Sequence, residues 1–152
     1  MISPDRYPFN AIEKLSEWTL TDIVSFALIL VGGLLRVWCF RTLGRFFTFA
    51  VVIQPDHKLI KDPPYSFVRH PSYTASFMVV FGIFGFYYPL GQALFGKDGQ
   101  TITAFLVVII SIMVVCFIVK RVQFEESEMA VKFKDEWEEY ARSRYRFIPY
   151  IV

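Results

Sequence analysis

The run Arg69-His70-Pro71-Ser72-Tyr73 brings together residue types that can bind a charged ligand at the start of an apolar segment. Proline is favoured at the first helical position, where its missing N–H would have no partner anyway, so we expect a helix to begin at Pro71. The N-terminus of that helix would offer backbone donors and a partial positive charge, to which Arg69 and His70 add. The run therefore predicts an anion-binding site; the alternative is a membrane-surface arginine beside an ordinary helix start.

A second polar group follows the most apolar part of the chain. Arg121 and Glu125 are four residues apart, so they can pair on one face of a helix. Glu126 falls on the apolar stripe of the same helix and has no basic residue one turn away. Charges next to a membrane span usually have a function. We interpret the group as part of a site, with a solvated acidic cluster as the alternative.

The chain that must position these groups has the composition of a membrane protein. Of the 152 residues, 55% are hydrophobic and 17 are Phe, and the mean hydropathy is +0.43. A soluble domain of this size would not bury so much apolar surface. Cys39 and Cys116 both lie in apolar runs, which indicates small core residues rather than a disulfide or metal framework.

Three apolar segments approach the roughly 17–20 residues needed to cross a bilayer, namely 23–40, 74–90 and 101–119. A fourth, 46–53, is too short to cross and would lie along the interface. The segment 121–145 has the periodicity of an amphipathic helix that continues the last span. We therefore predict an all-α, polytopic membrane helix bundle with three to four membrane helices and a cytoplasmic amphipathic C-terminal helix.

The distribution of basic residues predicts the orientation of this bundle. Lys and Arg are concentrated in the segment 41–73 and in the tail after Val119, whereas the connector 91–100 has only Lys97. The positive-inside rule then places the segment and the tail on the cytoplasmic side. The two polar groups are expected to meet on that face.

Other functions lack their sequence signatures. No glycine-rich turn follows a strand, which excludes a soluble enzyme of the Rossmann type. His57 and His70 have no Cys or Asp partner at ligand spacing, so no metal is expected. The basic residues are not interleaved as in a nucleic-acid-binding surface, so no nucleic-acid partner is expected.

Taken together, four spaced motifs resemble those of the isoprenylcysteine carboxyl methyltransferase family. They are His57-Lys58-Leu59-Ile60, Tyr65, the run from Arg69 to Tyr73, and Arg121-Val122 followed by Glu125-Glu126. The resemblance implies methyl transfer from S-adenosyl-L-methionine to the C-terminal carboxylate of a prenylated protein or peptide. It also implies a multi-pass protein of the endoplasmic reticulum membrane, in contact with the lipid bilayer, whose site faces the cytoplasm.

The same resemblance implies the residues of the site. The expected cofactor contacts are Gln54, His57, Lys58, Leu59, Ile60, Tyr65, Arg69, His70, Pro71, Ser72, Tyr73 and Glu125. Arg121 would bind the substrate, and Arg121, Glu125 and Glu126 would form the catalytic group. These residue types suit the cofactor, whose carboxylate, ammonium, sulfonium and base need cations or donors, an acid and aromatic faces.

Two departures from the family pattern affect these expectations. Pro63 stands where the family commonly has glycine, which stiffens the loop before Tyr65. Longer relatives carry additional N-terminal spans, so we expect a single membrane-embedded methyltransferase domain, 1–152, that lacks them. The alternatives are a phospholipid N-methyltransferase, an NADPH-dependent sterol reductase-like protein and a truncated, non-catalytic membrane relative.

Overall fold

The computed structural model describes residues 18–48 and 56–148, except for the side chains of residues 90–100. These residues form helices α2 (Leu20–Leu43), α3 (Pro71–Phe133) and α4 (Asp135–Ser143), with a short 3-10 helix, η2 (Gly44–Phe46), after α2. Helix α2 begins at a capping box, in which the Thr19 hydroxyl accepts from the Asp22 backbone and the Asp22 carboxylate accepts from the Thr19 backbone. The predicted all-α fold is thus confirmed for the described residues.

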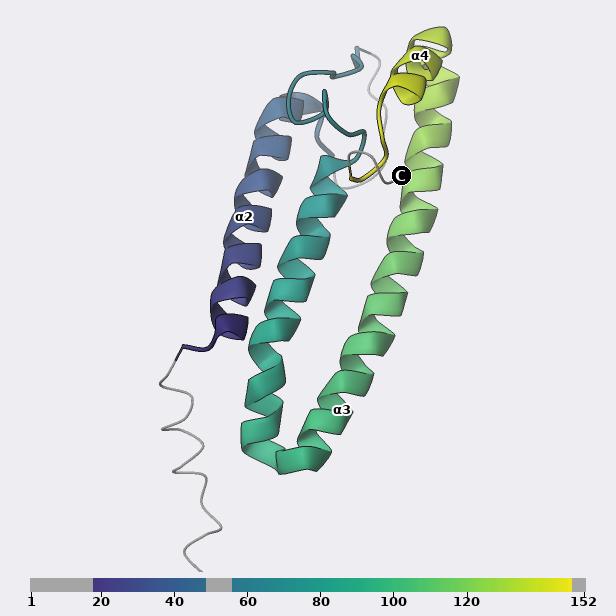
Figure 1. The fold of residues 1–152 in the computed structure, drawn as a ribbon. Helices are drawn as coiled ribbons and strands as arrows, with labels where there is room; N and C mark the ends of the chain where they lie inside the picture. The colour runs from purple at the N-terminus through teal and green to yellow at the C-terminus, as the bar shows by residue number, and fades with distance from the viewer. Residues whose placement is uncertain (1–17, 49–55, 149–152) are drawn as a thin grey trace, which may run out of the picture.

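Helix α3 folds back on itself, so that its first arm lies between α2 and its second arm, and the two arms join at the end of the molecule opposite α4 (Figure 1). The predicted segment 74–90 forms the first arm. The connector expected at 91–100 is helical, and α3 continues through it without a break. Pro89 lies within the helix before this region, and proline bends helices because it cannot donate the i→i−4 hydrogen bond.

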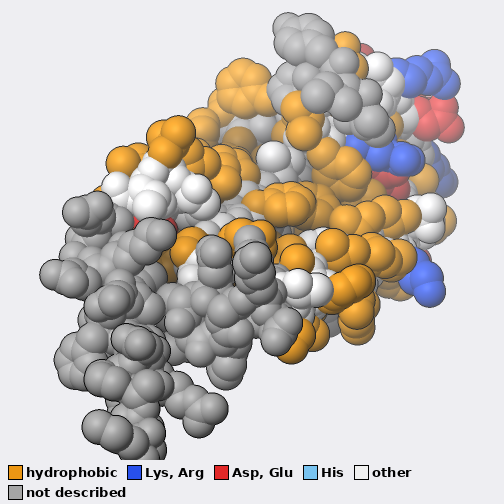
Figure 2. All heavy atoms as spheres, turned by 60° about the horizontal axis from the view of Figure 1, so that its bottom comes forward, with side chains coloured by type: hydrophobic (Ala, Val, Ile, Leu, Met, Phe, Trp, Pro, Cys, Tyr) orange, Lys and Arg blue, Asp and Glu red, His pale blue; other side chains and the backbone are white. Residues whose placement is uncertain are grey.

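Among the described residues, two stretches are long and apolar enough to cross a membrane, Leu20–Phe46 and Thr101–Phe133. Both carry large apolar side chains that face outward, such as Leu34, which is 62% exposed, and Phe105, which is 67% exposed. Hydrophobic side chains cover most of the described surface visible in Figure 2, and charged side chains gather toward one edge of that view. The helix expected at 46–53 falls largely outside the described residues.

Helix α2 packs against the first arm of α3 through small residues. A Cβ atom on Gly32 would lie 2.8 Å from the Ala75 carbonyl oxygen, and one on Gly82 would lie 2.6 Å from the Ser25 carbonyl oxygen. Ser25 and Ala75 are themselves buried. Without a hydrophobic driving force between helices in lipid, such close backbone contact is a main source of helix association.

The C-terminal helix differs from the prediction of one continuous helix over 121–145. Helix α3 ends at Phe133, and Lys134 adopts φ 47°, after which α4 begins at Asp135. The break turns α4 so that Trp137 and Tyr140 are buried against the rest of the molecule. A residue in this left-handed region ends a helix as a C-terminal glycine usually does.

Candidate functional site

The start of α3 is held by the C-terminal segment 144–148. As predicted, α3 begins at Pro71, with His70 as its N-cap residue. The backbone N–H groups of Arg69 and His70 donate to the carbonyls of Tyr145 and Arg146, at 2.8 and 2.9 Å. No periodic pattern in the sequence predicts this pairing, because it joins residues more than seventy positions apart.

Glu126 is the centre of an ion-pair network at this position. Its Oε1 atom lies 2.9 Å from Arg69 Nη1 and 3.1 Å from His70 Nε2, and its Oε2 atom lies 2.8 Å from Arg146 Nη2. A carboxylate can only accept, so the proton of the contact with His70 is on Nε2. Glu126 has no basic partner one turn away on its own helix, and its partners come instead from the loop before α3 and from the segment 144–148.

The network also bears on Arg69, which lines the cavity described below. Its guanidinium was expected to bind an external anion, but Glu126 already supplies one, and both side chains are largely buried, at 14% and 12% exposure. Burial lowers the pKa of Arg69, an effect opposed by the Glu126 carboxylate. An arginine nonetheless stays charged in proteins. Glu126 therefore compensates part of the charge of Arg69, because the same carboxylate also pairs with Arg146.

A second network joins the two arms of α3. The Tyr73 hydroxyl donates to Glu125 Oε1 at 2.8 Å and accepts from Arg121 Nε at 2.8 Å. Arg121 Nε also donates to Glu125 Oε1 at 3.1 Å, which is the predicted i,i+4 pair. His70 Nδ1 lies 3.8 Å from Glu125 Oε2. Arg121, on the second arm, and His70, the N-cap residue before the first arm, therefore contact the same carboxylate.

The loop before α3 supplies aromatic and imidazole groups. The buried Tyr140 hydroxyl of α4 donates to the Tyr65 carbonyl at 2.8 Å, and burial raises the pKa of Tyr140 to about 12. The His57 ring lies 4.8 Å from the Phe46 ring and 6.0 Å from the Phe133 ring, between centroids. Burial, followed by the charge of Lys132, lowers the pKa of His57. His57 is therefore neutral at pH 7.

These segments enclose a cavity of about 490 Å³ between α2, the loop before α3, both arms of α3 and α4. Eleven of the expected site residues line it: His57, Lys58, Leu59, Ile60, Tyr65, Arg69, His70, Ser72, Tyr73, Arg121 and Glu125. Pro71 and Glu126 do not line it. Glu126 is the next residue after Glu125 on the helix and is directed to Arg69 instead. Gln54 lies outside the described residues.

Sequence reasoning missed several lining residues. Arg36 and Phe40 come from α2, Val114 and Phe117 from the second arm of α3, and Trp137 from α4. Arg36 had a signal, since a cation inside an apolar span is unusual. The apolar residues had none, because apolar side chains facing lipid and those facing a cavity look alike in the sequence.

The cavity wall combines cations, one carboxylate, two imidazoles, phenols and apolar side chains. Such a set can bind a ligand that carries charges of both signs and an aromatic ring, next to a second ligand with an apolar chain. No group of three or more His, Cys, Asp or Glu side chains within residues 18–48 and 56–148 is placed to hold a metal ion.

Comparison with known proteins agrees with the family resemblance of the sequence motifs. The sequence model of the isoprenylcysteine carboxyl methyltransferase (ICMT) family matches residues 24–131. The chain is 27% identical over 140 residues to a probable protein-S-isoprenylcysteine O-methyltransferase of Oryza sativa subsp. indica, which covers 91% of this chain and 66% of the relative. It is 26% identical over 137 residues to protein-S-isoprenylcysteine O-methyltransferase B of Arabidopsis thaliana, covering 89% and 62%.

A fission yeast protein matches over a longer stretch. The protein-S-isoprenylcysteine O-methyltransferase of Schizosaccharomyces pombe is 27% identical over 148 residues, which covers 96% of this chain and 56% of the relative. The chain therefore spans 56–66% of the length of these curated relatives. No solved structure matches it.

Proposed function

The chain belongs to the isoprenylcysteine carboxyl methyltransferase family, and on that premise we propose that it methylates the C-terminal carboxylate of prenylated cysteine with S-adenosyl-L-methionine as methyl donor. One observation carries the proposal. His57, Tyr73 and Glu125 come from the loop and from the two arms of α3, yet they line the same cavity.

The cavity fits this donor in size and chemistry. Its volume of about 490 Å³ lies within the range of about 300–1,000 Å³ typical of small-molecule sites. The buried Nδ1 atom of His57 has no hydrogen-bond partner among the described residues. A buried polar atom of this kind is costly unless a ligand satisfies it. The Glu125 carboxylate suits the ammonium or ribose of the donor, and Tyr65 and Tyr73 suit its base or sulfonium.

The protein's main contribution to methyl transfer is placement. When bound, the donor supplies a sulfonium methyl group, whose carbon bonds to the acceptor's carboxylate oxygen as the carbon–sulfur bond breaks and leaves its electron pair on sulfur. The acceptor is already ionised at neutral pH, so no side chain has to remove a proton. Arg121 would orient the acceptor's carboxylate, with its own guanidinium held by Tyr73 and Glu125. Glu126 would position Arg69 and His70.

The membrane supplies the setting for the acceptor. We assign the first arm of α3 as a third crossing beside the two apolar stretches, with the polar end of the molecule on the cytoplasmic side of the endoplasmic reticulum membrane. Phe117 and Val114 line the cavity on the span of the second arm. A prenyl chain entering from lipid would keep its apolar surroundings there, each buried methylene contributing about 0.8 kcal/mol.

A methyl-transfer assay tests this function. Detergent-solubilised protein is incubated with methyl-labelled S-adenosyl-L-methionine and either acetyl-farnesylcysteine or phosphatidylethanolamine. We expect label in a base-labile methyl ester of the farnesylcysteine. Label in the phospholipid would instead indicate an N-methyltransferase. Binding of a nicotinamide cofactor would indicate a reductase, and absence of any donor binding a non-catalytic relative.

A further inference from the structure

The chain after α4 returns to the start of α3 (Figure 1), and we call this segment, residues 144–148, the strap. A parallel bridge joins Val68 to Tyr145, and two carbonyls of the strap accept from the N–H groups of Arg69 and His70. N–H groups this close to a helix start have no carbonyl partner within the helix. The strap therefore supplies acceptors that α3 itself cannot provide.

Two side-chain contacts hold the strap on the arms of α3. Arg146 Nη2 lies 2.8 Å from Glu126 Oε2, on the second arm. The Thr74 hydroxyl, on the first arm, donates to the Phe147 carbonyl at 2.7 Å. Neither Arg146 nor Thr74 lines the cavity. The strap therefore joins the two arms at a place outside the cavity.

The residues that the strap holds do line the cavity. Arg69 and His70 are both part of its wall. The His70 ring lies 3.1 Å from Glu126 Oε1 through Nε2 and 3.8 Å from Glu125 Oε2 through Nδ1. Its centroid lies 6.0 Å from that of the Phe147 ring in the strap. Glu125 is the acid assigned above to the methyl donor, so a displaced strap would shift side chains that face the donor.

Arg146 is the anchor of the strap whose removal disturbs the rest of the molecule least. Its side chain is 44% exposed, whereas that of Glu126 is 12% exposed. Glu126 keeps Arg69 and His70 as partners when Arg146 is lost, so its buried carboxylate is not left without a cation. Loss of Arg146 should therefore loosen the strap while the fold is kept.

We infer that Arg146 is a positioning residue for the methyl donor. It holds the strap against α3, and the strap holds Arg69 and His70 in the geometry that binds S-adenosyl-L-methionine. This inference rests on the proposed function, and it gives the C-terminal segment a role outside the four sequence motifs. A protein whose binding-competent state is only partly populated binds with an affinity reduced by that fraction. Loss of Arg146 should therefore raise the donor's Kd, and saturating donor should restore the competent state.

Calorimetric titration of the full, detergent-solubilised chain with S-adenosyl-L-methionine tests the role of Arg146. Arg146→Met removes the charge and keeps an unbranched side chain. We expect its Kd to rise at least about fivefold, the lower end of typical coupling between separate sites. At saturating donor, kcat and KM for acetyl-farnesylcysteine should stay within about twofold. Arg142→Met removes an arginine from an exposed pair with Glu138, and this matched control should bind the donor as the wild type does.

Two readouts separate positioning from a general loss of structure. Misfolded protein lowers the number of binding sites per chain and leaves the Kd of the folded fraction unchanged, and that outcome for Arg146→Met would overturn the proposal. Arg146→Lys keeps the charge, and because Nη2 makes the contact with Glu126, an ammonium can replace it. We expect this variant to bind the donor within about threefold of the wild type. Binding as weak as that of Arg146→Met would contradict a role of the ion pair.

Thr74→Val tests the strap from its other anchor. Valine has nearly the shape of threonine, so this variant removes only the hydrogen bond to the Phe147 carbonyl. We expect the donor's Kd to rise about two- to tenfold, and an unchanged Kd would refute the role of the strap even if Arg146→Met fails to fold.

Turnover keeps the failure of this inference distinct from that of the proposed function. A wild type that binds the donor but methylates no carboxylate removes the proposed acceptor, while weaker donor binding by Arg146→Met would still support the strap. Normal methylation with unchanged donor affinity in folded Arg146→Met refutes the strap alone. A wild type that does not bind the donor removes both.

Discussion

At the scale of single residues, Glu126 shows how a charge can be embedded at low cost. Three cationic or protonatable side chains, from the loop before α3 and from the segment 144–148, surround its carboxylate. The pairs with Arg69 and His70 are shielded from solvent, so removal of Glu126 would leave the buried charge of Arg69 without its carboxylate partner. The network therefore fixes the loop, the start of α3 and the C-terminal segment against one another.

Substitution of this acid should be strongly destabilising. We expect Glu126→Gln to destabilise the protein by roughly 2–4 kcal/mol, because removing one partner of a buried ion pair typically costs about 3–5 kcal/mol and glutamine keeps part of the hydrogen bonding. Thermal unfolding in detergent measures the change. Glu138→Gln is the control, since Glu138 and Arg142 are an exposed pair, with 62% and 80% exposed side chains, and should shift the midpoint little. Equal shifts would contradict the role of the network.

The phenol of Tyr73 is expected to act on donor binding. Its hydroxyl connects Arg121 to Glu125, and Tyr73→Phe removes both hydrogen bonds while keeping the ring. We expect the Kd of S-adenosyl-L-methionine to rise by about 10–100-fold, the equivalent of one hydrogen bond to a charged group. Isothermal titration calorimetry checks this. Tyr87→Phe, an exposed residue of the same arm, should bind the donor as the wild type does.

At the scale of helices, the close packing of α2 against α3 depends on particular glycines. Gly32 faces the Ala75 carbonyl, whereas a Cβ atom on the adjacent Gly33 would meet nothing within 4 Å. The two positions share a helix and a sequence neighbourhood, and they differ in what they face. They therefore offer a matched pair for measuring the contribution of the contact.

We expect Gly32→Ala to lower the thermal stability of the detergent-solubilised protein. The added methyl would lie 2.8 Å from a backbone oxygen, so the helices must separate. Gly33→Ala should leave stability unchanged or raise it slightly, because alanine is the better helix former by about 1 kcal/mol. If both variants unfold at the same temperature, the two helices do not approach at Gly32 as the structure has them.

Sequence patterns predict the features of the fold that depend on neighbouring residues. They do not predict contacts between residues that are far apart in the chain. Pro71 marks the start of α3, and the apolar runs mark its arms and α2. The break at Lys134 has no Gly or Pro, so periodicity carried the predicted helix through it. The i,i+4 spacing of Arg121 and Glu125 predicts their pair. The partners of Glu126 could not be predicted, because they depend on how the chain folds back.

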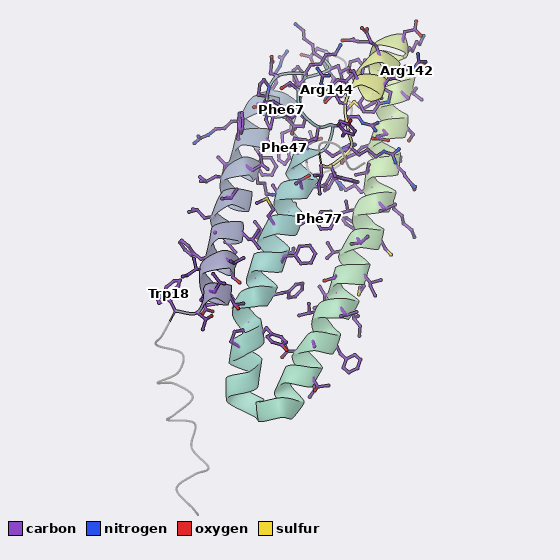
Figure 3. The ribbon with its side chains drawn as sticks, in the orientation of Figure 1. Trp18, Phe47, Phe67, Phe77, Arg142 and Arg144 are labelled. Atoms are coloured by element: carbon purple, nitrogen blue, oxygen red, sulfur yellow. The ribbon has the colours of Figure 1, made fainter. Side chains whose placement is uncertain are left out.

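At the scale of the whole molecule, the polar residues of the candidate site and the apolar surface occupy different ends. The loop before α3, the C-terminal segment and α4 lie together at one end, where Arg142 and Arg144 are labelled, and Trp18 lies toward the other end of α2 (Figure 3). Lys61 of the loop pairs with Glu136 of α4 at 2.9 Å. One face of the membrane should therefore carry the whole site.

Cysteine labelling tests this arrangement. In a background with Cys39→Ala and Cys116→Ala, single cysteines are introduced as Lys61→Cys, Glu136→Cys or Trp18→Cys. In sealed microsomes whose cytoplasmic face is outward, a membrane-impermeant maleimide should label the first two. It should label Trp18→Cys only after permeabilisation, because α2 lies between the two ends. Labelling of Lys61→Cys and Glu136→Cys from opposite sides would contradict the fold.

The central claim is that a loop and two arms of one helix form a single pocket for a sulfonium methyl donor. Calorimetric titration of the solubilised protein with S-adenosyl-L-methionine tests it most directly, when His57→Ala and Glu125→Gln are compared with the wild type. Both side chains line the cavity from separate segments. We predict saturable binding by the wild type and at least about tenfold weaker binding by each variant. A wild type that does not bind the donor, or a folded variant of either residue with unchanged affinity, would contradict the claim.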